Sequence, residues 1–380
     1  MPLDKIWLSS PHMGGAERNY VTEAFDTNWV APLGPNVTGF EKDLESYQGQ
    51  HSQVAALSSG TAAIHLALIQ AGVGPGDEVI CQSFTFCGTT NPVQYLGATP
   101  ILVDSEEDTW NICPKALKEA VEDRIAKGKK PKAILAVHLY GMPYKVDEIH
   151  AFAKATQIPV IEDSAEALGS TYKGRKCGTF GEYGILSFNG NKIITTSGGG
   201  ALVCRSKEVK ERTVFLATQA RDAAPHFQHS EVGYNYRLSN ISAGIGRGQM
   251  QVLDKHVALR RKMNVFYCDL FRGMEGITVQ AAPSEAIFSN HWLSAILVDP
   301  LKTGGLTREH IRLALEAEQI ESRPLWKPVH LQPLCKDFPY YGGKVCETLF
   351  EMGLCLPSGS NLTDADRERI RTAIHRIGSH

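Results

Sequence analysis

Short apolar runs alternate with helical patterns from about residue 53 to about residue 205. The apolar runs are QVAAL (53–57), DEVICQS (77–83), TPILVDS (99–105), KAILAVHLY (132–140) and IPVIEDS (158–164). Between them lie stretches with the spacing of amphipathic helices, among them TAAIHLALIQAG (61–72) and VDEIHAFAKATQ (146–157). This alternation predicts an α/β fold in which helices cover both faces of a largely parallel sheet. In such sheets the chemistry gathers at the carboxyl ends of the strands.

The pattern changes after residue 240. The segment 241–274 predicts one long helix that has a glycine-loosened turn near its start and ends near Gly273. Further strand-like and helical stretches follow: HWLSAILVD (291–299), TREHIRLALEAE (307–318), IESRPLW (320–326) and DADRERIRTAIHRI (364–377). We therefore expect a large domain over residues 1–250 and a smaller C-terminal α+β domain over residues 251–380, which begins with the long helix. One continuous domain is the alternative.

Composition and charge exclude several classes of partner. Lys and Arg number 39 against 41 Asp and Glu, which gives a formal charge of -2. Nucleic acids and anionic membranes normally attract clustered positive charge, so neither is an expected partner, and an anionic substrate must be held by local groups. The start MPLDKIWLSS lacks the character of a secretory signal, and no apolar run approaches the ~20 residues that span a bilayer. We expect a cytoplasmic protein without membrane insertion.

The nine cysteines contain no C-x-x-C pair. Neither a disulfide framework nor a zinc site is therefore expected, and no metal is predicted.

A lysine and an aspartate are the first candidates for chemistry. Lys192 lies in ILSFNGNKIITTSGGGA (185–201), between an apolar run and a glycine cluster. A lysine whose amine is held neutral by burial can attack a carbonyl and form a Schiff base, although an exposed loop lysine is the alternative. Asp163 directly follows a hydrophobic strand, where a carboxylate needs a cationic or donor partner. It could keep a pyridine nitrogen protonated, or it could simply cap the next helix.

A hydroxyl-rich helix start and an aromatic strand end complete the pattern. The stretch SSGTAA (58–63) would offer free N–H groups and hydroxyls to a phosphate, unless it is an ordinary helix cap. Ser187 could add a further hydroxyl. Phe84 follows the next strand and could stack on a flat ring, unless it is a core residue. The order Thr61, Phe84, Asp163, Lys192 on an α/β scaffold fits fold type I pyridoxal phosphate enzymes.

Motifs along nearly the whole chain resemble those of the DegT/StrS-type nucleotide-sugar aminotransferases. They are PHMGG (11–15), NWVAPLGP (28–35), SSGTAA (58–63), SFTF (83–86), HLYG (138–141), EDSAEALGS (162–170), GTFGEYG (178–184), SFNGNKIITTSGGG (187–200), GYNYRLSN (233–240) and RPLW (323–326). Within the family, the branch that makes UDP-4-amino-4,6-dideoxy-N-acetylglucosamine for bacillosamine-type sugars is the most similar. The resemblance implies a fold type I enzyme that acts as a homodimer with shared active sites.

The resemblance also implies roles for individual residues. Lys192 would be the Schiff-base lysine, Asp163 would pair with the pyridine nitrogen, and Phe84 would cover the ring of pyridoxal 5'-phosphate (PLP). The other cofactor-binding residues would be Ser59, Gly60, Thr61, Glu166, Ser187 and Asn235. Of these, Asn235 would come from the second subunit, and Glu166 stands where many members carry His or Gln. The sugar nucleotide would contact Asn28, Trp29, Val30, Ala31, Trp326, Lys327 and His330.

The activity implied is a ping-pong transfer of an amino group. L-glutamate would convert PLP to pyridoxamine phosphate, which would then aminate C4 of a UDP-4-keto-6-deoxy-N-acetylhexosamine, with Lys192 moving the proton in both halves. The same chemistry on another keto sugar, such as a GDP-linked one, is the first alternative. A non-catalytic binding protein is the second. Sugar 3-dehydratases of this fold are disfavoured because they replace the Schiff-base lysine with histidine, whereas Lys192 is present.

Overall fold

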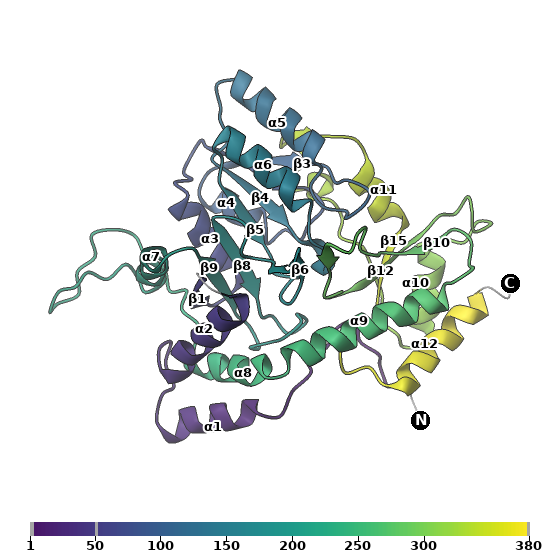
Figure 1. Ribbon diagram of the computed structural model, residues 1–380, viewed down its shortest axis with the longest axis horizontal. Helices are drawn as coiled ribbons and strands as arrows, with labels where there is room; N and C mark the ends of the chain where they lie inside the picture. Colours follow the sequence, from purple (N-terminus) through teal and green to yellow (C-terminus); the bar gives the residue numbers. More distant parts are fainter. Residues whose placement is uncertain (1–3, 50–51, 378–380) are drawn as a thin grey trace.

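The fold is built on a large central sheet covered by helices (Figure 1). The computed structural model describes residues 4–49 and 52–377. Its central sheet has the order β1-β9-β8-β5-β4-β2-β3-β14. Of these eight described strands, β9 alone runs against the others, so the largely parallel sheet expected from the sequence is confirmed. The strands are β1 (Gln53–Leu57), β2 (Glu78–Gln82), β3 (Thr99–Val103), β4 (Ala133–Val137), β5 (Val160–Asp163), β8 (Tyr183–Ser187), β9 (Gly200–Cys204) and β14 (Tyr340–Tyr341).

Both faces of the sheet are buried under helices, as continuous apolar strands require. Side chains of α3 and α7 pack on one face with Leu102 and Leu202, and side chains of α5 and α6 pack on the other with Ile80 and Ile134. A third cluster joins α2 to the β1 end of the sheet. These helices are α2 (Pro35–Gln48), α3 (Gly60–Gln70), α5 (Pro114–Ala126), α6 (Val146–Thr156) and α7 (Lys207–Ala217), with the short α4 (Asn91–Tyr95) beside them.

A second, antiparallel sheet lies in the C-terminal part of the chain. Its order is β10-β12-β15-β13, and its core includes side chains of α9, α10 and α12. The elements are α9 (Leu253–Leu270), β10 (Ile277–Val279), β12 (Ser294–Val298), α10 (Arg308–Ala317), β13 (Arg323–Pro324), α11 (Val345–Met352), β15 (Gly353–Leu356) and α12 (Asp364–Ile377). A small sheet of β11 (Ile287–Phe288), β6 (Thr171–Tyr172) and β7 (Arg175–Lys176) completes the strands described. The division of the chain into domains at residue 250 stays a prediction.

The expected long helix after residue 240 is broken into two. Helix α8 (Asn240–Met250) ends just before Gln251, and α9 begins at Leu253 and runs along the base of the molecule (Figure 1). The glycines of α8 do not loosen a turn. They allow α1 (Glu17–Asp26) to approach closely, since a Cβ on Gly248 would lie 2.6 Å from the backbone nitrogen of Glu17.

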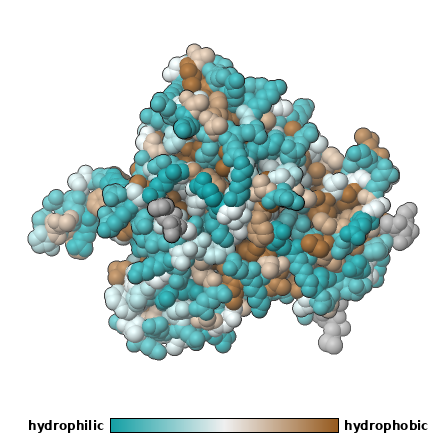
Figure 2. All heavy atoms as spheres, in the orientation of Figure 1, coloured by the Kyte–Doolittle hydropathy of each residue, from teal (hydrophilic) through white to brown (hydrophobic). Residues whose placement is uncertain are grey.

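The segment between α7 and α8 forms a long arm that projects from the body of the molecule (Figures 1 and 2). Its residues Phe227 and Val232 are each 78% exposed. In the described part of the chain, no helix combines the length and apolar character needed to cross a membrane.

Candidate active site

A pocket of about 380 Å³ lies at the carboxyl ends of the central strands. Loops that follow β1, β2, β5 and β8 form its floor, as expected for an α/β sheet. Two tryptophans from the C-terminal part of the chain, Trp292 and Trp326, form part of its wall. The pocket is therefore built from segments that are far apart in the sequence.

Half of the predicted site residues meet in this pocket. Those that line it are Ser59, Gly60, Thr61, Asp163, Glu166, Ser187, Lys192 and Trp326. Those that do not line it are Phe84, Asn235, Asn28, Trp29, Val30, Ala31, Lys327 and His330.

Lys192 lies in a tight turn after β8, where its N–H donates to the carbonyl of Asn189 at 3.0 Å. Its amine lies 3.6 Å from Glu166 Oε1 and 4.1 Å from the centroid of the Trp292 ring. The side chain is 14% exposed, so this lysine is not the exposed loop residue that the sequence left as an alternative. A carboxylate and an aromatic face thus locate a largely buried amine at the pocket.

Asp163 is the last residue of β5 and is held by two donors. The Thr89 hydroxyl donates to Oδ2 at 2.6 Å, and the backbone N–H of Ala165 donates to Oδ1 at 3.2 Å. The hydroxyls of Thr85 and Thr89 are themselves 2.8 Å apart. These contacts fix a nearly buried carboxylate at the pocket, where it can face a cationic ring nitrogen.

Glu166 is the second buried carboxylate. Its Oε2 accepts the N–H of Tyr140 at 2.7 Å, and Tyr140 has the left-handed φ of 54° that directs this N–H. Burial raises the pKa of Glu166, while the Lys192 amine and the Tyr140 N–H oppose the rise and the charge of Asp163 adds to it. The two carboxylates therefore differ in their surroundings, because two donors fix Asp163 whereas burial favours the protonated form of Glu166.

The start of α3 offers a cradle of free donors that could hold a phosphate. Ser59 caps the helix by accepting the N–H of Ala62 at 3.0 Å, and the first N–H groups of the helix, at Gly60 and Thr61, have no intrahelical acceptor. A Cβ on Gly60 would lie 3.3 Å from the Cβ of Ser187, so only glycine leaves the space between them open. The cap and the anion site expected from the sequence therefore coexist at one helix start.

The phenylalanine that lines the pocket is Phe86, which corrects the prediction for Phe84. Phe84 is fully buried in a core cluster with Leu139 and Trp292, whereas Phe86 is 55% exposed and lines the pocket. The chain bends over residues 83–85, so strand alternation no longer decides which phenylalanine faces the site. The Phe86 ring lies 5.4 Å from that of Trp326.

The predicted diphosphate ligands lie away from the pocket. His330 is held by Ser83, whose Oγ is 2.8 Å from Nδ1, and it stacks on Tyr340 at 3.9 Å. These contacts hold the His330 ring in place, and its role as a diphosphate ligand stays a prediction. Lys327 is exposed outside the pocket.

The early loop and the arm also lie outside the pocket of this chain. Trp29 and Val30 are 40% and 54% exposed, and Asn28 and Asn235 are exposed as well. Ala31 is half-buried, and its carbonyl accepts the N–H of Asn240 at 2.8 Å. None of these residues lines the pocket of this chain.

Several pocket residues were not predicted. Trp292, Thr85 and Thr89 belong to segments that were assigned to strands or motifs without a role in the site. The hydroxyls of SFTFCGTT (83–90), just after β2, are the signal that could have indicated the Asp163 partners. Trp292 has no local signal, because its contact with Lys192 spans 100 positions of sequence.

The fold and this donor set fit PLP. The cradle accepts a phosphate, Asp163 accepts a protonated ring nitrogen, Lys192 supplies the amine, and Phe86 supplies a flat apolar face. A sheet of this topology with these groups at its carboxyl edge defines a PLP-dependent enzyme of the aminotransferase type.

The chain belongs to the DegT/DnrJ/EryC1/StrS aminotransferase family, whose model matches residues 11–375. It is 50% identical over 370 residues to EpsN of Bacillus subtilis (strain 168), a protein assigned to the PLP-dependent aminotransferases, covering 96% of this chain and 94% of EpsN. It is 36% identical over 378 residues to GDP-perosamine synthase of Caulobacter vibrioides, covering 99% of each chain.

Solved structures agree with this assignment. The PLP form of Spr1654 from Streptococcus pneumoniae, assigned as a sugar aminotransferase, superposes with a TM-score of 0.88 at 26% identity and 99% coverage of both chains. A pyridoxamine phosphate form of the same protein has the same TM-score. The protein is therefore a PLP-dependent sugar aminotransferase, and the cofactor expected from the sequence is confirmed.

Proposed function

We propose that the protein transfers the amino group of L-glutamate to C4 of a UDP-4-keto-6-deoxy-N-acetylhexosamine. The products are UDP-4-amino-4,6-dideoxy-N-acetyl-D-glucosamine and 2-oxoglutarate. The observation that carries the chemistry is the contact of the Lys192 amine with Glu166 in a pocket that also holds Asp163 and the α3 phosphate cradle. The cytoplasmic location expected from the sequence belongs to the same proposal.

The residues of the chain divide the work between binding and proton transfer. When bound, PLP supplies a carbonyl that condenses with amines and a ring that withdraws electrons from the reacting carbon. Asp163, fixed by Thr89, holds the ring nitrogen protonated. Lys192 would hold the cofactor covalently and, when free, would carry the proton on Nζ between donor and cofactor. Glu166 lies within reach to hold a proton while Lys192 is neutral.

The aromatic wall supports a sugar as the amino acceptor. Phe86 and Trp326 form a tilted pair at the pocket, and aromatic faces bind the apolar faces of sugar rings. The indole N–H of Trp326 is buried without a partner among the described residues, which leaves a donor at this wall. The diphosphate would be held by a few individual cationic side chains near the pocket. Lys327 is the one that we propose from this chain.

A homodimer is part of the proposal. Asn28, Trp29, Val30 and Ala31, together with Asn235 near the base of the arm, do not line the pocket of their own chain. We propose that they lie at the active site of the partner subunit, which the arm that projects from the body of this chain would help to contact (Figure 1).

The choice of nucleotide is tested with the substrates themselves. The enzyme is incubated with PLP, L-glutamate and either UDP-4-keto-6-deoxy-N-acetylglucosamine or GDP-4-keto-6-deoxymannose, and the product sugar is examined by NMR. We expect an equatorial amine on C4 of the UDP sugar. Amination of the GDP sugar alone would favour the second candidate, which the similarity to GDP-perosamine synthase supports. Amination of neither would refute both.

The role of Lys192 is tested by Lys192→Ala. Loss of its amine should abolish turnover and the covalent attachment of PLP, measured as the mass added after borohydride reduction. The matched control is Lys207→Ala on α7, because this lysine is 75% exposed in a surface ion pair with Glu211 and should leave both unchanged. Full activity in Lys192→Ala would refute the assignment.

A further inference from the structure

Arg260 of α9 is a buried cation without a carboxylate partner. Its side chain is 1% exposed, and no ion pair to it is found among residues 4–49 and 52–377. The guanidinium donates instead to the carbonyl of Trp292 at 2.7 Å, the hydroxyl of Ser9 at 2.9 Å and the carbonyl of Lys192 at 3.3 Å. Its Nε has no partner among the described residues, and burial lowers its pKa to about 9.

Such an arrangement is poor for stability alone. A buried guanidinium loses its hydration, and three neutral acceptors return less than a carboxylate would. A buried donor without a partner adds to this cost and calls for an explanation. An apolar side chain of similar length could fill the same space without these losses. We therefore expect the guanidinium to have a role in positioning the residues that it contacts.

Its contacts surround Lys192. Ser9, which accepts from Arg260, donates its hydroxyl to the carbonyl of Asn191 at 2.6 Å. Trp292, whose carbonyl Arg260 holds, donates its indole N–H to the same Asn191 carbonyl at 2.7 Å. The Trp292 ring in turn lies against the Lys192 amine at 4.1 Å. Arg260 thus fixes the main chain of Lys192 directly and its amine through Trp292.

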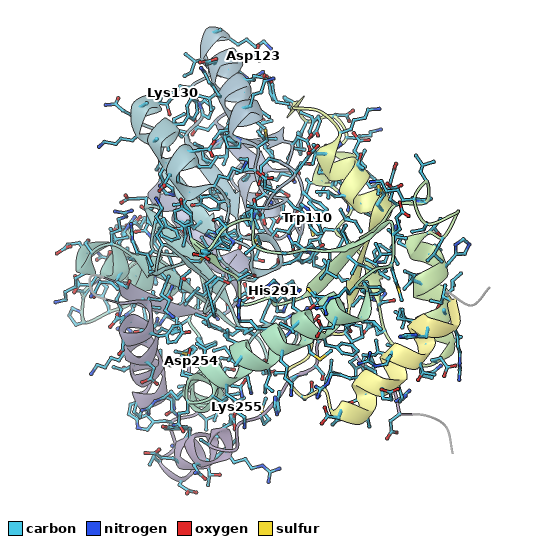
Figure 3. All side chains as sticks on the ribbon, turned by 45° about the vertical axis from the view of Figure 1, so that its right-hand side comes forward. Trp110, Asp123, Lys130, Asp254, Lys255 and His291 are labelled. Atoms are coloured by element: carbon cyan, nitrogen blue, oxygen red, sulfur yellow. The ribbon has the colours of Figure 1, made fainter. Side chains whose placement is uncertain are left out.

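Helix α9 provides a rigid base for this arrangement. It runs for 18 residues beneath the site, and Figure 3 shows His291, the neighbour of Trp292, beside the helix whose start is marked by Asp254 and Lys255. The segment around Trp292 leads into β12 of the second sheet, and Ser9 comes from the N-terminal segment. Arg260 therefore joins three parts of the chain at the back of the lysine.

We infer that Arg260 is a positioning residue for Lys192, which holds the lysine main chain and the Trp292 ring so that the amine meets the cofactor and the substrate carbon in a reactive geometry. This inference rests on the assignment of Lys192 made under the proposed function. Arg260 does not line the pocket and contacts no ligand itself.

The test measures the reactivity of the lysine apart from turnover. PLP is added to apoenzyme of wild type, Arg260→Met and Arg260→Lys, and the rate constant of covalent attachment is followed by absorbance and by mass after borohydride reduction. A displacement of about 1 Å at a reacting group can slow a reaction about 100-fold, so we expect attachment and the glutamate half-reaction per bound cofactor to slow by about this factor in Arg260→Met.

Arg260→Lys keeps the charge, but a lysine ammonium cannot donate to two carbonyls as the planar guanidinium does. We therefore expect this variant to fold normally and to attach PLP at least about 10-fold more slowly than wild type. If Arg260→Met does not fold, the attachment rate of Arg260→Lys alone tests the positioning role of Arg260. The matched control is Arg261→Met on the same helix, since Arg261 also donates to a main-chain carbonyl, that of Ser289, but does not contact Lys192. The control should react at the wild-type rate.

The outcomes separate the two assignments. Wild-type attachment to a lysine other than Lys192 would refute the proposed site. Attachment to Lys192 at rates within about twofold of wild type in both Arg260 variants would overturn the inference about Arg260. Equal slowing in the Arg261→Met control would also overturn it, because the effect would then reflect general destabilisation.

Discussion

His291 shows how one buried side chain sets a pH dependence. It is 7% exposed, and burial followed by the nearby charge of Arg261 lowers its pKa to about 4 from 6.5. Between about pH 4 and pH 6.5 this histidine therefore binds a proton in the unfolded chain but stays neutral in the native protein. The stability that depends on the neutral ring is fully present above pH 6.5 and is lost as the pH falls to about 4.

Replacing this ring should make the free energy of unfolding depend less on pH below pH 6.5. His291 has a φ of 46°, which asparagine tolerates better than most residues, so His291→Asn keeps the backbone and removes the titration. Between pH 6.5 and 4, wild type should lose up to about 3 kcal/mol more than the variant, because about 2.5 pKa units are involved. Urea unfolding at several pH values measures this. Parallel curves for the two proteins would contradict it.

Glu166 gives a second pH-dependent prediction, of opposite sign. Its raised pKa means that the folded protein favours the protonated acid, so ionising Glu166 costs stability as the pH rises above its ordinary value of 4.5. Glu166→Gln should therefore be more stable than wild type at neutral pH, with the difference shrinking in acid. Urea unfolding of the cofactor-free proteins tests this, and a variant less stable at neutral pH would contradict it.

At the scale of elements, close packing of α1 on α8 depends on glycine. A methyl group on an exposed helical glycine stabilises a helix by up to about 1 kcal/mol. On Gly248 it would instead meet the backbone of Glu17 at 2.6 Å, so we expect Gly248→Ala to lower the free energy of unfolding by about 1–3 kcal/mol. Gly74→Ala, where nothing lies within 4 Å of the added carbon, is the control and should be nearly neutral.

Other helices show where sequence patterns predict elements well. Periodicity located α12 at residues 364–377 and α10 beside its N-cap Thr307, because long amphipathic stretches with caps carry local signals. It missed the break at residues 251–252 and misjudged the glycines of α8, whose purpose depends on a helix more than 200 residues earlier. The prediction that Phe84 covers the ring fails for a related reason, since the bend after β2 is a tertiary feature.

At the scale of the whole molecule, the arm predicts that active sites are shared between subunits. In Lys192→Ala the site of its own chain is lost, whereas in Asn235→Ala the defect would lie in the partner's site. Co-expressed in equal amounts, half of the dimers would be mixed and each mixed dimer would have one intact site, so about one quarter of wild-type activity should return. Activity no greater than that of the separate variants would place each site within one chain.

The near balance of 39 basic and 41 acidic residues predicts how substrate binding responds to salt. Without a broad basic surface, the diphosphate meets a few local charges, and screening acts mainly on exposed, distant ones. The KM for the nucleotide sugar should therefore change by less than about threefold between low and high salt. Steady-state kinetics across a salt series measure this, and a steep rise in KM would indicate an extended basic surface.

The pocket itself could be predicted only in part. Lys192, Asp163 and the start of α3 follow apolar strands closely, and this placement is a local signal. Arg260 and Ser9 carry no such signal, because their contacts with each other and with the lysine turn join positions 251 and 182 residues apart. Which side chains support a site from behind is decided by the folded chain as a whole.

The wide separation of Ser9, Lys192 and Trp326 along the chain also governs how the enzyme is made. A ribosome can release the strands β1 to β9 of the central sheet before Trp292 and Trp326 of the pocket wall have been synthesised. During most of its synthesis the growing chain therefore lacks a complete cofactor site. Productive binding of PLP is accordingly among the last steps in the formation of the active enzyme.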